Sequence, residues 1–286
     1  MCLTELLDDA AGRWPLKPAL IDGETTVTYS ELREEILEWA ARLTSLGVSP
    51  GARVGISLPN GIAHVVLTFA VWKSGAVVVP IPGECAEAEV STIATTLQLE
   101  ALISPKARAH SEAIRAGVFF TKLSGAQRPD AHGQNIAFIR FTSGTSHERK
   151  GVVLCHETVR DRVMAANKAL RIGPEDTVMW CLPMSHHFLV TIVLYLSQGA
   201  AIVLARQVLA GLFLELVHRH RGTVLYAAPF HYGLLARDAS GGAFLRCAWR
   251  SRRPARCRKR WRNDFISDSA CRWRRRWASS NSASCA

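Results

Sequence analysis

The sequence has no long hydrophobic run and no clustered cysteines. No apolar segment approaches the roughly 20 residues that a helix needs to cross a bilayer. The N-terminal residues Met-Cys-Leu-Thr-Glu show neither the basic start nor the apolar core of a signal peptide. The body cysteines Cys2, Cys85, Cys155 and Cys181 form no Cys-x-x-Cys pair and no zinc-ligand spacing. These absences argue against a membrane span and a zinc site, and they predict a cytoplasmic protein with reduced thiols.

An excess of either charge is also missing from most of the chain. The formal net charge is +11, which by itself would suggest a nucleic-acid or membrane partner. However, the last 41 residues hold 12 Arg, one Lys and two Asp, and residues 1–245 hold 22 basic and 22 acidic side chains. The basic character therefore belongs to the tail alone, and we divide the chain into a body, residues 1–245, and a basic low-complexity tail, residues 246–286.

The body alternates strand-like and helix-like segments. Hydrophobic residues make up 48% of the 286-residue chain, enough for a sizeable core. The predicted strands are 19–22, 53–58, 76–80, 101–103, 136–141, 177–181, 200–204 and 223–226. The predicted helices are one starting near 28 and ending before 47, then 62–73, 86–97, 156–169, 186–197, 207–219 and 229–237. This order, with strands that are almost continuously apolar, predicts an α/β fold of largely parallel sheets flanked by helices.

One loop has the composition of an anion-binding site. The strand predicted at 136–141 runs into Thr142-Ser-Gly-Thr-Ser-His-Glu-Arg-Lys150, followed by a second apolar run. Gly144 allows backbone N–H groups to turn toward an anion, the hydroxyls add donors, and Lys150 supplies a positive charge. The loop is not a Walker A motif, because Arg149 and Gly151 occupy the places of its second glycine and its Mg²⁺-binding Ser or Thr. From composition alone, an ordinary surface loop is the commoner interpretation.

Several ordered motifs together resemble the adenylate-forming superfamily, which includes acyl-CoA synthetases and acyl-AMP ligases. The segment 142–151 is similar to the loop that identifies that family. The other matching segments are Val27-Thr-Tyr-Ser-Glu-Leu32, Gly47-Val-Ser-Pro-Gly-Ala-Arg-Val54, Leu58-Pro-Asn60, 70–80 and Leu182-Pro-Met-Ser-His-His-Phe188. Motifs in the same order over about 220 residues are more specific than any one of them. The resemblance implies that the body is an incomplete N-terminal domain of such an enzyme.

The resemblance also implies site residues and partners. It assigns the β- and γ-phosphates of ATP to a group of loop residues, namely Thr142, Ser143, Gly144, Thr145, Ser146 and Lys150. His186 matches the family histidine beside the acyl pocket, although taken alone it would more readily be a loop residue that caps the next helix. ATP and Mg²⁺ are the implied cofactors. The implied substrates are a carboxylic acid and a thiol acceptor, either CoA or a carrier-protein phosphopantetheine. The residues themselves indicate no metal site and no nucleophilic triad.

The tail breaks the pattern of the body. It shows no helical or strand periodicity, and we expect it to be disordered. One interpretation is an arm that binds nucleic acid through its arginines and tryptophans. We favour an out-of-frame translation of a GC-rich gene. Suitable codons for Cys247–Lys259, read from the third base, give Arg-Leu-Ala-Val-Ala-Ala-Pro-Gly-Pro-Leu-Pro-Gln, which is similar to the family's next Pro-Leu-Pro segment.

The expected change of reading frame after residue 245 has a functional consequence. The resemblance places the Mg²⁺-binding Glu, the ribose-binding Asp and the C-terminal lid with its lysine after this point, so no catalytic residue is assigned. We expect the 286-residue chain to have little or no adenylation activity. A non-catalytic nucleotide-binding remnant remains an alternative function, and nucleic-acid binding through the tail is a less favoured one.

Overall fold

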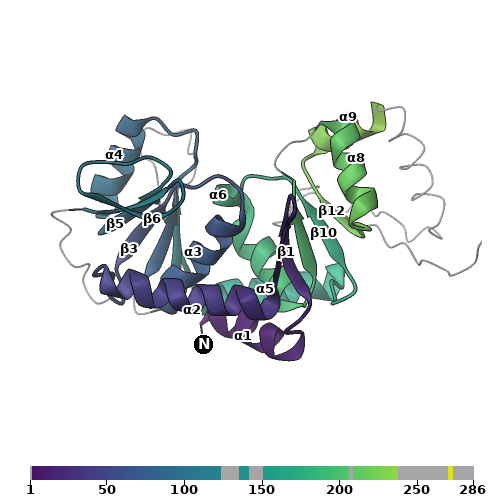
Figure 1. Cartoon of the computed structure of the whole chain (residues 1–286), viewed down its shortest axis with the longest axis horizontal. Helices are drawn as coiled ribbons and strands as arrows, with labels where there is room; N and C mark the ends of the chain where they lie inside the picture. Colours follow the sequence, from purple (N-terminus) through teal and green to yellow (C-terminus); the bar gives the residue numbers. More distant parts are fainter. Residues whose placement is uncertain (1, 124–134, 142–150, 206–208, 238–269, 273–286) are drawn as a thin grey trace, which may run out of the picture.

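Two sheets lie side by side and are covered by helices (Figure 1). The computed structural model describes residues 2–123, 135–141, 151–205, 209–237 and 270–272. The six-stranded sheet has the order β13-β12-β10-β11-β1-β2, and the seven-stranded sheet has the order β6-β7-β5-β3-β4-β8-β9. In both sheets the central strands are parallel, and the outer strands β2, β13, β6, β7 and β9 pair in antiparallel fashion. The predicted fold class is therefore confirmed.

The elements follow one another in short succession. The strands are β1 (Pro18–Asp22), β2 (Thr25–Thr28), β3 (Arg53–Ile56), β4 (Val77–Pro80), β5 (Ala101–Ser104), β6 (Ser111–Arg115), β7 (Val118–Lys122), β8 (Ile136–Phe141), β9 (Gly151–Cys155), β10 (Thr177–Trp180), β11 (Ala201–Leu204), β12 (Val224–Tyr226) and β13 (Ala270–Arg272). The α-helices are α1 (Leu3–Arg13), α2 (Tyr29–Ser45), α3 (Ile62–Lys73), α4 (Glu87–Thr96), α5 (His156–Leu170), α6 (Met184–His187), α7 (Val193–Ser197), α8 (Ala210–Arg219) and α9 (Pro229–Arg237). A π-helical segment, Phe188–Ile192, joins α6 to α7.

Each predicted strand and helix has a counterpart, and three differences are informative. The helix predicted at 186–197 starts two residues earlier, at Met184, and is interrupted by the π-helical segment. The helix α1 and the hairpin formed by β6 and β7 were not predicted. The helix predicted from residue 207 begins at Ala210, and residues 206–208 lie outside the described part of the chain.

The start of α2 follows directly from its sequence. The backbone N–H of Glu31 donates to the Thr28 hydroxyl at 3.3 Å, and the N–H of Thr28 donates to the Glu31 carboxylate at 2.7 Å. This reciprocal pair is a capping box, and it satisfies two N–H groups that lack partners inside the helix. The helix ends before Gly47, whose φ of +91° is costly for any residue with a Cβ.

The helix α3 lies at the centre of the core. Ten of its 12 residues are buried, which agrees with a sequence that is apolar on all sides. The largest of them, Trp72, packs edge-on against Phe69 and Phe188, and its indole N–H donates to the backbone carbonyl of Ala137 at 2.7 Å. One continuous cluster of buried side chains therefore joins the two sheets through α3.

The tail contributes one described element. Strand β13 pairs with β12 through Arg272 opposite Val224 and Ala270 opposite Tyr226. Residues 246–269 and 273–286 lie outside the described part of the chain, so the boundary at residue 245 stays a prediction. No helix among the described residues combines the length and apolar character needed to span a membrane.

Candidate functional site

The two sheets are joined where the chain leaves strands β3 and β10. Asn60, in the turn after β3, donates from Nδ2 to the Leu182 carbonyl and accepts the Met184 N–H at Oδ1, both at 2.8 Å. The Leu182 carbonyl also accepts the indole N–H of Trp180 at 2.8 Å. A single amide group therefore holds the corner after β10 against the corner after β3. Carboxyl ends of parallel strands are the usual place for a binding site in an α/β fold.

This corner carries His186, the predicted pocket residue, and the adjacent His187. His186 lies close to strand β8 and contacts Arg140 on that strand. Arg140 Nη1 donates to the His186 carbonyl at 3.1 Å, and Arg140 Nη2 lies 3.5 Å from His186 Nδ1. On its other side, His186 Nε2 lies 3.8 Å from a carboxylate oxygen of the exposed Glu84. His186 thus lies at the junction between the sheets, and its role beside an acyl pocket stays a prediction.

His187 turns toward the other sheet. Its Nδ1 lies 3.3 Å from the hydroxyl of Tyr226, at the end of β12, and the two rings meet edge-on. Tyr226 in turn stacks on Trp180, with ring centroids 5.2 Å apart. Burial lowers the pKa of His187, and the nearby His186 and Arg140 lower it further. A neutral imidazole is therefore favoured at this position.

A buried histidine supports the same junction from below. His64 on α3 is 3% exposed, lies with Nδ1 3.1 Å from the Leu58 carbonyl, and stacks on Phe188. Burial lowers its pKa to about 4, against opposing hydrogen bonds to the backbone of Leu58 and Pro59. His64 therefore connects the turn after β3 with the first residue after α6.

The predicted phosphate loop begins beside these residues. Thr142, Ser143, Gly144, Thr145, Ser146 and Lys150 all lie outside the described residues. The strands on either side are described: β8 and β9 form an antiparallel pair in which Phe141 lies opposite Gly151. Phe141 and Gly151, which flank the loop in the sequence, thus lie at the carboxyl end of β8, next to Arg140 and its contact with His186.

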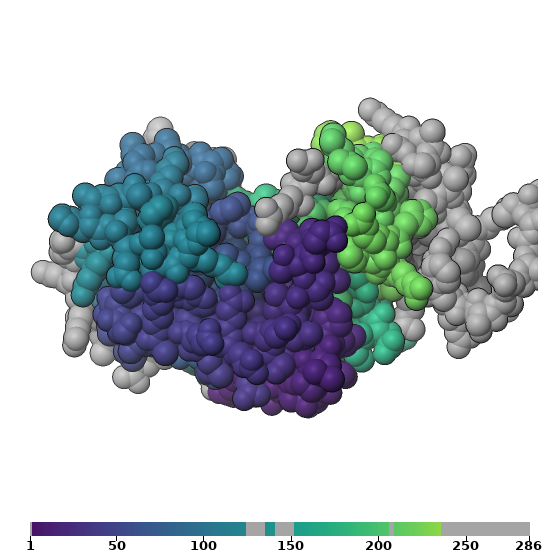
Figure 2. Space-filling view, in the orientation of Figure 1, coloured from purple at the N-terminus to yellow at the C-terminus, as the bar shows by residue number. Residues whose placement is uncertain are grey.

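The surface is hollowed between the sheets. A groove of about 640 Å³ is lined by the turn Leu58–Ala63, by Cys181 and Pro183 after β10, and by the β1–β2 and β6–β7 turns. Figure 2 shows the hollow along the upper edge of the molecule, between its two halves. Among the described residues, no group of three or more His, Cys, Asp or Glu side chains is placed to hold a metal ion. No Mg²⁺ ligand is therefore assigned in this part of the chain.

Comparison with known proteins identifies the family. The sequence profile of the AMP-binding enzymes matches residues 7–266. The chain belongs to the AMP-binding enzyme family. Its curated relatives include malpinin synthetase from Mortierella alpina, which is 28% identical over 72% of this chain, and nonribosomal peptide synthetase 8 from Aspergillus fumigatus, which is 32% identical over 60%. The chain spans only 3% and 2% of the lengths of these two proteins.

Solved structures of AMP-binding enzymes share the fold. The inhibitor-bound N-terminal domain of FACL13 from Mycobacterium tuberculosis superposes with a TM-score of 0.72 at 22% identity, covering 84% of this chain and 66% of that domain. The N-terminal subdomain of Klebsiella oxytoca NpsA, in complex with anthranilyl-AMSN, gives a TM-score of 0.68 at 21% identity, covering 83% of this chain and 64% of that subdomain. The likeness confirms that the fold is that of the N-terminal domain of adenylate-forming enzymes.

Sequence reasoning identified part of this site. It singled out His186 and the segment containing Asn60, which the structure brings to the same corner. It missed Arg140 and Glu84. A signal for Arg140 was present, because it is the one charged residue in the otherwise apolar strand Ile136–Phe141.

Proposed function

We propose that this chain carries the ATP- and acid-binding part of an AMP-dependent ligase. In the proposed reaction, a carboxylate attacks the α-phosphorus of ATP, which gives an acyl-AMP and releases pyrophosphate. The thiol of CoA or of a carrier-protein phosphopantetheine then attacks the acyl carbonyl and displaces AMP. The observation that carries the proposal is the family match over residues 7–266, together with a loop of the matching composition at the end of β8.

The described residues have positioning roles in this proposal. Asn60 fixes the corner that presents His186, and Arg140 connects that corner to the strand that leads into the loop. Holding reactants in a fixed relation removes much of the entropic barrier to a reaction between two molecules. Hydrogen-bond donors and cations placed in advance stabilise the charge that develops on the phosphates.

The phosphate-binding role of Thr142, Ser143, Gly144, Thr145, Ser146 and Lys150 remains part of the proposal. The loop would bind the β- and γ-phosphates, with Mg²⁺ expected to accompany ATP as in the family. Mg²⁺ would supply charge neutralisation at the phosphates, and no described residue is assigned to it.

The test is ATP binding by the 286-residue chain, measured by isothermal titration calorimetry with Mg²⁺ present. We expect saturable binding, and we expect Lys150→Ala to weaken it about tenfold, because one charge-assisted hydrogen bond is lost. The matched control is Lys168→Ala, at an exposed lysine in the last turn of α5. Equal binding by the wild-type chain and the Lys150→Ala variant would refute the assignment of the loop.

Catalysis is tested separately, by acid-dependent exchange of pyrophosphate into ATP. We propose that the 286-residue polypeptide shows no exchange above background, because its residues after 245 include no recognisable counterpart of the family's metal-binding and lid motifs. Exchange above background would refute this inactivity. ATP binding without exchange would support a non-catalytic nucleotide-binding role for this polypeptide.

A further inference from the structure

Arg140 is a cation that no acidic side chain of the described residues neutralises. It is the fifth residue of β8 (Ile136–Phe141), its side chain is exposed, and its guanidinium extends to the corner after β10 on the other sheet. Within the described part of the chain, it forms no ion pair with an acidic side chain. The carboxylate of Glu84 lies near His186 instead.

Other arginines of this chain show the contrast. Arg108 forms a two-pronged pair with Glu87, Arg42 pairs with Glu112, and Arg219 pairs with Glu24. In each of these a carboxylate offsets the charge. At Arg140 the partners in the described residues are a backbone carbonyl and an imidazole nitrogen, both from His186. The guanidinium has five N–H donors in a planar fork, so donors remain for a further acceptor.

The two partners also fix the direction of this fork. The bond to the His186 carbonyl restrains the long side chain, so that less rotational freedom remains to be lost when an acceptor binds. The neighbouring His187 is favoured in its neutral form, because burial lowers its pKa. Arg140 therefore keeps a positive charge at this junction whatever the protonation state of His187.

We propose that Arg140, restrained by His186, is an anion-binding group at the junction between the sheets and takes a phosphate or carboxylate oxygen of a substrate. This inference rests on the proposed function, which supplies both anions: the polyphosphate of ATP and the carboxylate of the acid. A guanidinium suits either, because its fork matches two oxygens of a carboxylate or a phosphate.

The experiment uses the full chain and two simple probes, sodium tripolyphosphate and sodium hexanoate, each titrated by calorimetry. Arg140→Gln is expected to lower the affinity of the chain for one of the two probes about tenfold, because one charge-assisted contact is lost. Arg140→Lys is expected to weaken the same probe by less, because it keeps the charge without the fork. The matched control is Arg33→Gln, on α2, whose exposed pair with Asp8 lies in another part of the molecule.

The arms distinguish the sources of the anion. Loss of tripolyphosphate binding assigns Arg140 to ATP, and loss of hexanoate binding assigns it to the acid. Unchanged affinity for both probes, or no binding of either by the wild-type chain, overturns the subsite. Thermal unfolding of Arg140→Gln at the wild-type temperature shows that the variant is folded.

Failure of the subsite and failure of the proposed function give different results. If Lys150→Ala weakens ATP binding while Arg140→Gln changes neither probe, the function stands and the subsite does not. If the wild-type chain does not bind ATP but Arg140→Gln still weakens tripolyphosphate, the subsite stands without the function.

Discussion

Single polar residues hold the corner after β10 against the seven-stranded sheet. Asn60 contributes an amide that binds Leu182 and Met184, and Arg140 contributes a guanidinium that binds the His186 carbonyl. His64 fills the space below as a neutral ring. Each acts at the junction of elements far apart in the sequence, so that a change at one of them is expected to disturb the site more than its own element.

The buried His64 makes stability depend on pH. Its pKa is about 4 in the folded chain and about 6.5 in the unfolded chain. Between these values the unfolded chain binds a proton that the folded chain does not, so the free energy of unfolding falls as the pH falls. Between pH 7 and pH 5 we expect this effect of His64 to lower the free energy of unfolding by about 2 kcal/mol.

The variant His64→Asn keeps a donor for the Leu58 carbonyl but does not titrate. The free energy of unfolding, measured in urea, should therefore fall less between pH 7 and pH 5 than in the wild-type chain. The difference between the two falls should be about 2 kcal/mol. The exposed His110→Asn is the control, and it should behave as the wild-type chain does. If the free energy of unfolding of His64→Asn falls as much between pH 7 and pH 5 as that of the wild-type chain, another group causes the acid sensitivity.

The amide of Asn60 is predicted to stabilise the junction. Asn60→Ala leaves the Met184 N–H without this partner and removes one of two donors to the Leu182 carbonyl, at a cost of about 1–3 kcal/mol. Because Trp180 donates to the same carbonyl, the indole N–H resonance of Trp180 should shift in a ¹⁵N NMR spectrum. Unchanged stability together with an unmoved Trp180 resonance would rule out this role.

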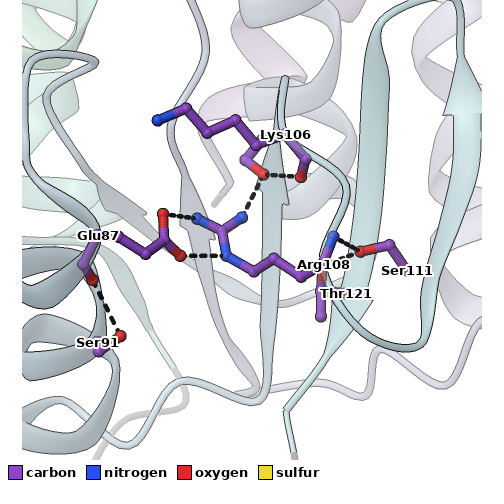
Figure 3. A network of polar contacts seen from close by, with 7 residues as sticks. Glu87, Ser91, Lys106, Arg108, Ser111 and Thr121 are labelled. Atoms are coloured by element: carbon purple, nitrogen blue, oxygen red, sulfur yellow. Dashed lines mark hydrogen bonds and ion pairs between the residues drawn. The ribbon is translucent and has the colours of Figure 1, made fainter.

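At the scale of elements, the β6–β7 hairpin is attached to α4 through one arginine. Arg108 donates to the Glu87 carboxylate at 2.7 and 3.0 Å and to the Ser104 hydroxyl at 2.6 Å. Its own N–H donates to Ser111, whose hydroxyl lies 2.9 Å from that of Thr121 (Figure 3). The hairpin lines the groove, so this network sets one wall of the candidate site.

Replacing Arg108 by Gln should loosen that wall. We expect about 1 kcal/mol of lost stability, since the side chain is partly buried and its pair is two-pronged. Amide exchange should become faster in Ser111–Arg115 while α3 stays protected, as measured by hydrogen–deuterium exchange. Arg219→Gln breaks only exposed pairs and should change stability by less than about 0.5 kcal/mol. Equal effects of the two substitutions would contradict the proposed attachment.

The accuracy of prediction differed between elements for physical reasons. The limits of α3 were predicted to the residue, because its apolar residues are bounded by Gly61 and Gly75. The hairpin was missed, because Ser111–Arg115 is mostly polar and gains its order from pairing with β7. The π-helical segment Phe188–Ile192 has no periodic signal of its own, since its shape depends on packing against α3.

The site was predictable where a motif carried it and not where packing made it. His186 was found by its segment. Its contact with Arg140 joins residues 46 positions apart, and no local pattern reports such a pair. The order of motifs still predicted an α/β domain of largely parallel sheets, because the motifs at 58–60, 142–151 and 182–188 each follow a strand of those sheets.

At the scale of the whole molecule, the two sheets bring strand β8, which leads into the loop 142–150, and the corner 182–187 to a common junction. The central claim is that ATP binds there. The most direct measurement is hydrogen–deuterium exchange of the full chain with and without adenosine 5′-(α,β-methylene)triphosphate and Mg²⁺. The account predicts slower exchange in both segments and unchanged exchange in α2. Slower exchange confined to the tail, or no change in either segment, would contradict it.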